Sequence, residues 1–255
     1  MSSSGRDAEA EFVAGHLPGA VRFDLDRVSD PHATLPHMMP SAERFAESMR
    51  ALGLDDEDTV VVYDGSGVNL SAPRAWWMFR VFGHERVAVL DGGFGAWTRE
   101  GRPIEAGPDA RRPPGNFTAR LDAGRVADAA RVLRIVQSRD AQVVDARSAG
   151  RFAGIEPEPR PGLRAGHIPG SRNVPYTTLV GPDGRLLPPA ELRHRFDEAG
   201  LDPSRPMVAT CGSGVTACAV VLALEAAGFP GAAVYDGSWT EWGADPRLPV
   251  ATGHS

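Results

Sequence analysis

The fold is decided by one stretch, Pro206-Met207-Val208-Ala209-Thr210-Cys211-Gly212-Ser213-Gly214-Val215-Thr216. Its first half is a short apolar run typical of a buried strand. Residues 217–227, which follow, are apolar and end before Gly228, as expected of a helix with a glycine cap. The sequence therefore predicts a strand, a tight turn and a helix, with Cys211 at the start of the turn.

This turn is suited to a reactive sulfur. Its two glycines allow successive backbone N–H groups to converge on one point, and the next helix adds the positive end of its dipole. A negative charge is favoured there, so Cys211 is expected to act as a nucleophilic thiolate. A small buried cysteine in a capping turn is the plainer alternative, but Gly212-Ser213-Gly214 is more than a cap requires.

The same pattern occurs earlier in the chain as Val61-Val62-Tyr63-Asp64-Gly65-Ser66-Gly67. Two further motifs recur in the same order: Gly15-His16-Leu17-Pro18-Gly19 with Gly166-His167-Ile168-Pro169-Gly170, and Leu90-Asp91-Gly92-Gly93 with Tyr235-Asp236-Gly237-Ser238. Short strands alternate with helical segments, which predicts mostly parallel α/β sheets flanked by helices. We expect two copies of one fold: a first domain over residues 1–102, a proline-rich linker over 103–116 and a second domain over 117–255.

The copies differ in two respects. Asp64 stands where the second copy has Cys211, so only the second copy can carry out thiol chemistry. The second copy also has a strand at residues 142–145 and a helical segment before Gly166, whereas only residues 1–14 precede Gly15. The first domain is therefore expected to be truncated, with unpaired strand edges. A misplaced start, a fragment or closure by another subunit would each explain this.

Composition narrows the class of protein. The chain has 255 residues and a formal net charge of -6 without a basic cluster, which argues against nucleic acid as a partner. No apolar run approaches the roughly 20 residues of a membrane span, and residues 1–10 lack a signal-peptide core, so a cytoplasmic location is expected. With only Cys211 and Cys218, neither a disulfide framework nor a cysteine metal site is expected, and no cofactor is predicted.

Together these motifs resemble the tandem-domain rhodaneses. The resemblance runs from about Phe12 to the C-terminus and includes residues 211–216, Gly150-Arg151-Phe152 with Glu156-Pro157-Glu158-Pro159-Arg160, residues 71–77 and residues 235–239. It implies an inactive first domain packed on a catalytic second one, with the active site in the cleft between them. The implied reaction transfers sulfur through a persulfide on Cys211 to cyanide or to a thiol, such as thioredoxin or a small thiol.

The resemblance also implies a substrate and its site. Gly212 and Ser213 stand where thiosulfate-using members carry cations, which favours the branch that takes sulfur from 3-mercaptopyruvate and releases pyruvate. In that branch Arg151 and Arg160 would bind the carboxylate and ketone, and a guanidinium can hold a carboxylate bidentately. Ser213, His37 and Asp26 would form a proton relay, and Gly212, Gly214, Val215 and Thr216 would line the substrate loop. From the residues alone, a loop histidine and a surface aspartate explain His37 and Asp26 equally well.

Other classes of protein share some of these sequence features. A cysteine phosphatase needs an arginine six residues after the cysteine, and Ala217 stands there. A thiosulfate sulfurtransferase is one alternative, and a non-catalytic sulfur-carrier or interaction module is another if the truncated first domain does not fold. Several residues are expected to be structural instead: His16 and His167 in turns, Trp76, Trp77, Phe79 and Phe82 in the core, Asp145 with Arg147 in an ion pair, and Cys218 inside a helix.

Overall fold

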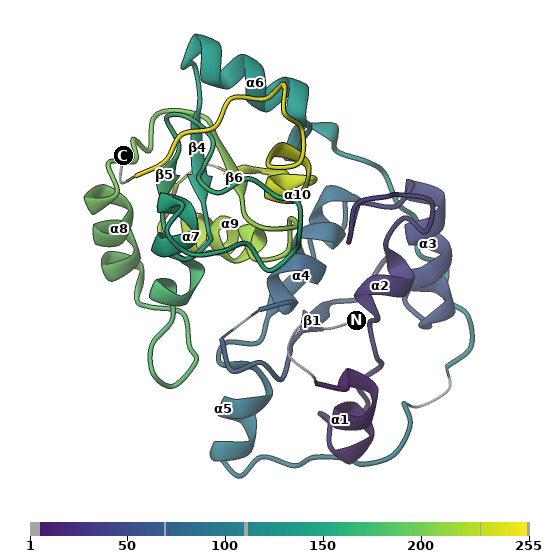
Figure 1. Cartoon of the computed structure of the whole chain (residues 1–255). Coiled ribbons are helices and arrows are strands. Elements are labelled where there is room, and N and C mark those ends of the chain that lie inside the picture. The colour runs from purple at the N-terminus through teal and green to yellow at the C-terminus, as the bar shows by residue number, and fades with distance from the viewer. Residues whose placement is uncertain (1–5, 69, 110–111, 230, 254–255) are drawn as a thin grey trace.

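The computed structural model describes residues 6–68, 70–109, 112–229 and 231–253, so residues 110 and 111 of the predicted linker lie outside it. The described chain forms two α/β units (Figure 1). The first contains α1 (Ala8–Ala14), α2 (Leu25–Val28), α3 (Ala42–Ala51), β1 (Val60–Val62), α4 (Ala72–Val81), β2 (Val87–Val89) and α5 (Gly93–Arg99). The second contains η1 (Ala123–Arg125), β3 (Val126–Ala127), α6 (Ala129–Ser138), β4 (Gln142–Asp145), α7 (Ala149–Ala153), β5 (Arg172–Asn173), η2 (Tyr176–Leu179), α8 (Pro189–Glu198), β6 (Met207–Thr210), α9 (Ala217–Ala226), β7 (Ala233–Tyr235) and α10 (Ser238–Trp242).

The second unit is built on a parallel five-stranded sheet with the strand order β3-β7-β6-β4-β5. Every residue of β4 and β6 is buried, as expected for central strands covered by helices on both faces. Because the strands run in one direction, the loops after β4, β5, β6 and β7 meet at the same edge. This edge carries the candidate site, and the predicted parallel α/β architecture is confirmed.

The first unit repeats part of this sheet. Val61 pairs with Ala88 in the parallel pair β1–β2, as Val208 pairs with Ala233 in the second unit. In the described first unit no strand lies on the other edge of β1, where β4 pairs with β6 in the second unit. Val61 is consequently 54% exposed, whereas Val208 is 1% exposed. The described first unit therefore has no counterpart of β4, although a helix, α1, precedes Gly15.

The two units share one apolar interface, formed mainly by α4 against α9. The predicted core residues Trp76, Trp77, Phe79 and Phe82 are all buried, with at most 5% exposure. Nine of the ten residues of α4 are buried, because the helix is enclosed by both units. The interface therefore fixes the first unit against the helix that follows Cys211.

The chain between the units lies against the first one. The described residues of the predicted linker form neither a helix nor a strand apart from one bridge between His16 and Glu105. Phe117, which was predicted to open the second domain, is fully buried and packs edge-on against Phe45 and Phe79. Its large apolar ring packs against aromatic rings of the first unit. The chain therefore still contacts the first unit at Phe117, the residue at which the second domain was predicted to begin.

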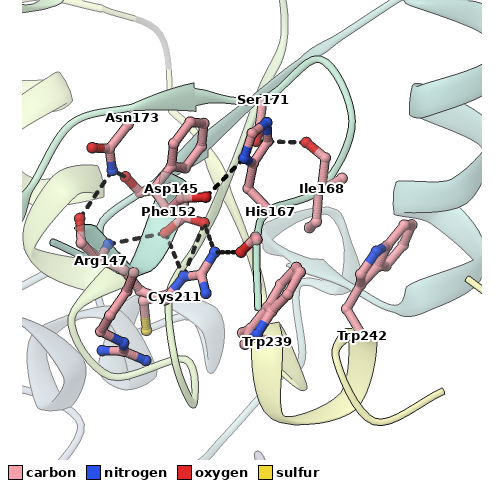
Figure 2. A network of polar contacts seen from close by, with 12 residues as sticks. Asp145, Arg147, Phe152, His167, Ile168, Ser171, Asn173, Cys211, Trp239 and Trp242 are labelled. Atoms are coloured by element: carbon pink, nitrogen blue, oxygen red, sulfur yellow. Dashed lines mark hydrogen bonds and ion pairs between the residues drawn. The ribbon is translucent and has the colours of Figure 1, made fainter. Parts of the chain in front are cut away.

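The paired turn histidines are confirmed as structural groups. His16 stacks on Phe12 with ring centroids 4.1 Å apart, and its Nδ1 lies 2.9 Å from the Phe12 carbonyl oxygen. His167 repeats this on Phe152, at 3.8 Å and 2.8 Å (Figure 2). Each histidine therefore ties the end of one helix to the following turn.

Among the described residues, no helix is long and apolar enough to cross a membrane.

Candidate active site

Cys211 directly follows β6 and is held by the turn after β7. Its side chain lies in the interior, with 2% exposure of the residue. Its N–H donates to the Ser238 hydroxyl oxygen at 3.2 Å, and its carbonyl oxygen accepts the Trp239 N–H at 3.0 Å. Ser238 in turn donates to the Tyr235 carbonyl oxygen. The backbone of the cysteine is therefore fixed by two neighbouring strand ends.

The loop after Cys211 presents open backbone donors. In the described chain, the N–H groups of residues 212–216 donate to no protein atom, and this loop leads into the ten-residue helix α9. Gly214 has a φ of 76°, and a Cβ there would lie 2.7 Å from the Asp236 carbonyl oxygen, so only glycine fits. The Gly212 carbonyl oxygen accepts hydrogen bonds from the Thr240 N–H and hydroxyl groups. The carbonyl oxygens of Val215 and Thr216 accept the first N–H groups of α9. The loop therefore forms a cradle that favours an anion.

The corresponding cradle of the first unit is already filled. One oxygen of the Asp64 carboxylate accepts the Ser66 N–H at 2.8 Å. The other accepts the N–H groups of Ser71 and Ala72, both at 2.9 Å, at the start of α4. A built-in carboxylate thus occupies the place that an anionic substrate would need. The first copy is closed to anions, and the second is open.

Arg151 lies on α7 beside this open loop. A Cβ on Gly212 would be 3.1 Å from the Arg151 Nη2, so the guanidinium lies against the loop. The same Nη2 donates to Glu158 at 2.6 Å, and the Glu158 side chain is 3% exposed. Nothing in the sequence pattern predicts a role for Glu158. The structure shows that it orients the predicted substrate-binding arginine.

Glu158 belongs to a longer chain of charges. It also accepts from Arg147 at 2.8 Å, and Arg147 pairs with Asp145 at 2.6 Å. The side chains of Arg147 and Asp145 are fully buried, which confirms the predicted structural ion pair. Figure 2 shows the pair close to Cys211 at the carboxyl edge of the sheet. A network anchored at the end of β4 therefore sets the direction of Arg151.

His37 and Asp26 reach this region from the first unit. The His37 Nε2 lies 3.8 Å from the Asp26 carboxylate, which is 75% exposed. Burial lowers the pKa of His37. The positive charges of Arg74 and Arg160 lower it as well, whereas the negative charges of Asp26 and Asp236 raise it. His37 is therefore neutral near pH 7. Arg160, the other predicted substrate-binding arginine, is exposed, and its charge is one of the weaker influences on His37.

Ser213 is not joined to this pair. Its hydroxyl makes no hydrogen bond to His37 or to any other described residue, although its backbone belongs to the loop after Cys211. The structure thus brings Cys211, Arg151 and His37 to one seam between the units. The predicted Ser-His-Asp relay is present here only as a loose His-Asp pair.

Two further residues hold the seam together and were not predicted as site residues. Arg74 of α4 is fully buried and donates to Asp236 at 2.7 Å, to the His37 carbonyl oxygen at 2.6 Å and to the Gly214 carbonyl oxygen at 3.3 Å. Although burial disfavours its charge, the Asp236 carboxylate raises the pKa of Arg74. Asp236 also accepts the Met39 N–H at 2.7 Å. Arg74 lies in residues 71–77, which carry the family resemblance, and Asp236 lies in the repeated motif of residues 235–238. These motifs were the only features of the sequence that pointed to the two residues.

Comparisons with known proteins agree with this arrangement. The family model described as a rhodanese-like domain matches residues 6–100 and 128–245. The chain is 49% identical to 3-mercaptopyruvate sulfurtransferase of Rattus norvegicus over 252 residues, covering 98% of this chain and 84% of the relative. It is 44% identical to thiosulfate sulfurtransferase of Cricetulus griseus over 258 residues, covering 100% and 86%.

A solved structure gives the same result. SseA, a 3-mercaptopyruvate sulfotransferase from Escherichia coli, aligns with a TM-score of 0.84 and 42% identity, over 93% of this chain and 88% of that one. The chain therefore belongs to the rhodanese family, with one rhodanese-like domain in each half.

Proposed function

We propose that this protein transfers sulfur from 3-mercaptopyruvate, through a persulfide on Cys211, to a thiol or cyanide acceptor, and releases pyruvate. The observation that carries the proposal is the position of Cys211, which begins a loop at a helix N-terminus. The five backbone N–H groups of residues 212–216 in this loop donate to no atom of the described chain. A sulfur anion is favoured there. The identity to 3-mercaptopyruvate sulfurtransferases over most of the chain supports the same reaction.

The substrate would be held by its carboxylate. Arg151, oriented by Glu158, lies beside Gly212, and Arg160 follows two residues after Glu158 in the same loop. An arginine pair at one side of the loop can bind the carboxylate and ketone while the substrate sulfur points at Cys211. Gly212 adds no side chain, so the reacting atoms have room.

The first half of the reaction balances without a cofactor. The Cys211 thiolate attacks the substrate sulfur, an S–S bond forms and the C–S bond breaks, and its electron pair leaves as the enolate of pyruvate. The new persulfide still carries the substrate thiol proton. His37, which is neutral and close to the loop, would accept this proton from the outer sulfur of the persulfide and pass it to the enolate carbon.

In the second half, an acceptor takes the outer sulfur of the persulfide. A thiolate acceptor forms its own persulfide, and Cys211 leaves as a thiolate, which restores the resting enzyme. Thioredoxin or a small thiol would suit this step, as predicted from the family resemblance. A cytoplasmic location belongs to the same proposal.

Thiosulfate is the second candidate donor, because one relative bears that name. Its doubly charged sulfonate would gain from cations next to the cysteine, and here those positions are Gly212 and Ser213. We therefore expect 3-mercaptopyruvate to be used with much the higher kcat/KM. Equal or better use of thiosulfate would favour the second candidate.

Mass spectrometry of the intact protein tests the proposal. Wild type and Cys218→Ser should each gain the mass of one sulfur atom after exposure to 3-mercaptopyruvate, and Cys211→Ser should not. Cys218 is the matched control, because it is fully buried and burial raises its pKa to about 12. A sulfur adduct on Cys211→Ser, or none on wild type, would contradict the assignment.

A further inference from the structure

Thr240, the third residue of α10, contacts the loop after Cys211 but has no part in the mechanism above. Its backbone N–H donates to the Gly212 carbonyl oxygen at 2.9 Å, and its hydroxyl donates to the same oxygen at 2.6 Å. A carbonyl oxygen has two lone pairs, so these two donors use both and hold it in one direction. Thr240 therefore fixes the peptide that joins Gly212 to Ser213.

The direction of this carbonyl group determines the direction of the next N–H. In a planar trans peptide the C=O and N–H groups point to opposite sides. Because the Gly212 C=O points to α10, the Ser213 N–H points away from α10. It donates to no atom of the described chain. The Ser213 N–H is therefore a donor whose direction is fixed and whose acceptor is a ligand or the reacting sulfur.

The first unit shows which group lies in that direction. Ser66 corresponds to Ser213 in the repeat, and its N–H donates to the Asp64 carboxylate at 2.8 Å. Asp64 stands where the second copy has Cys211. In the repeated loop, this N–H thus points to the side chain at the first position of the loop, which is an anion in the first copy and a thiol in the second.

The two copies differ on the other side of the loop. The first unit has Gly95 at the position of Thr240, and the Gly65 carbonyl oxygen accepts from the exposed Arg6 at 2.9 Å instead. There the built-in Asp64 carboxylate orients the loop N–H by accepting from it. The second loop has no such carboxylate, so its N–H has to be directed from behind the peptide, which is where Thr240 donates.

We propose that Thr240 is a positioning residue for sulfur transfer: by holding the Gly212 carbonyl oxygen, it directs the Ser213 N–H toward the sulfur of Cys211. This N–H donates to the sulfur when it is an anion, in the resting thiolate and again when the acceptor has taken the outer sulfur. The Thr240 hydroxyl acts through the peptide and touches neither sulfur nor substrate. The inference rests on the proposed function, in which Cys211 carries the sulfur.

Two substitutions isolate the hydroxyl. Thr240→Val removes it and keeps the branched shape, a similar helix propensity and the backbone N–H, whereas Thr240→Ser keeps it. Neither changes a charge. The charged and titratable groups around the loop belong to other residues, which both variants retain: Arg151 of α7, Arg74 of α4, Asp236 after β7, Cys218 of α9, Tyr176 of η2 and His37 of the first unit.

The test is the rate of alkylation of Cys211 by neutral iodoacetamide as a function of pH, in a Cys218→Ser background so that one thiol reports. Thr240→Val should move the half-maximal rate to higher pH by about half to one unit, which is roughly a three- to tenfold loss near neutral pH. The rates should converge at high pH, and Thr240→Ser should follow wild type.

Thr98→Val is the matched control. Thr98 is an exposed residue of α5 whose hydroxyl donates to the Phe94 and Gly95 carbonyl oxygens at 3.0 and 3.1 Å. The substitution thus removes the same kind of hydrogen bond from a helix of the first unit. Its alkylation curve should coincide with that of wild type.

The outcomes separate positioning from packing. A Thr240→Val curve that coincides with wild type overturns the inference, as does an equal loss at every pH or a loss that Thr240→Ser shares. The assay needs no sulfur donor. If wild type forms a persulfide and the Thr240→Val curve does not shift, only this inference fails. If the curve shifts but wild type forms no persulfide, the positioning role stands and the proposed function fails.

Discussion

Asp236→Asn keeps the size of the side chain and removes the carboxylate that lies 2.7 Å from the Arg74 guanidinium. Arg74 is fully buried, so the substitution leaves a cation inside the interface without its counter-charge. Breaking such a buried pair costs about 3–5 kcal/mol, a large part of the roughly 5–15 kcal/mol by which a protein is folded. Asparagine can still accept the Met39 N–H. The loss of stability should therefore come from the unpaired charge of Arg74.

Urea unfolding of a double-mutant cycle measures this. Arg74→Met alone should also destabilise, because it strands the Asp236 carboxylate at 4% exposure. The double variant, Arg74→Met with Asp236→Asn, should regain most of the free energy of unfolding, since both charges are gone. A loss below about 1 kcal/mol for Asp236→Asn, or a double variant that loses the sum of the two, would refute the reasoning.

The double variant also separates stability from positioning. Without Arg74, the carbonyl oxygens of His37 and Gly214 lose the donor that ties them together. The protein should then be folded but slow to form the Cys211 persulfide. Wild-type rates in a folded double variant would show that the ion pair only holds the units together.

Two further predictions concern side chains near the loop. Glu158→Gln should raise KM for 3-mercaptopyruvate about tenfold with a smaller change in kcat, because Arg151 loses a charged partner. Glu156→Gln is the control, because Glu156 is exposed, lies two residues away and bonds to Ser148 instead of Arg151. His37→Gln should reduce the acid sensitivity of the melting temperature. The folded-state pKa of His37 lies below its usual value of 6.5, so the unfolded chain takes up the proton first and wild type loses stability as the pH falls below about 6.5. Equal loss of melting temperature in both proteins between about pH 7.5 and pH 5 would contradict this.

The parts of the fold that were predictable are those encoded locally. A repeated strand, glycine turn and helix around Asp64 and Cys211 indicated two α/β copies, because each element is set by neighbours in sequence. The turn histidines and the buried cluster on α4 followed from the same local patterns. The buried pair of Asp145 and Arg147 could be predicted because its members are two residues apart.

The parts that were missed depend on contacts between distant residues. Arg74 and Asp236 are 162 residues apart, and nothing in the surroundings of either residue indicates that the other covers it. Phe117 joins the first unit because a pocket between Phe45 and Phe79 is there to receive it, which composition cannot show. Ser213 was expected to face His37, but the direction of a side chain on a loop is set by packing that spacing alone does not determine.

The two glycine loops explain why one half of the chain can be inactive and still be needed. Asp64 fills its own cradle and thereby caps α4, so the first loop is stable without a ligand. Cys211 is too short to reach its cradle in the same way, and the second loop keeps donors open for a sulfur anion or a substrate. Such a loop depends on outside support, and Arg74 of the capped helix supplies it by binding the Gly214 carbonyl oxygen. The stability of the closed copy thus holds the open copy in place.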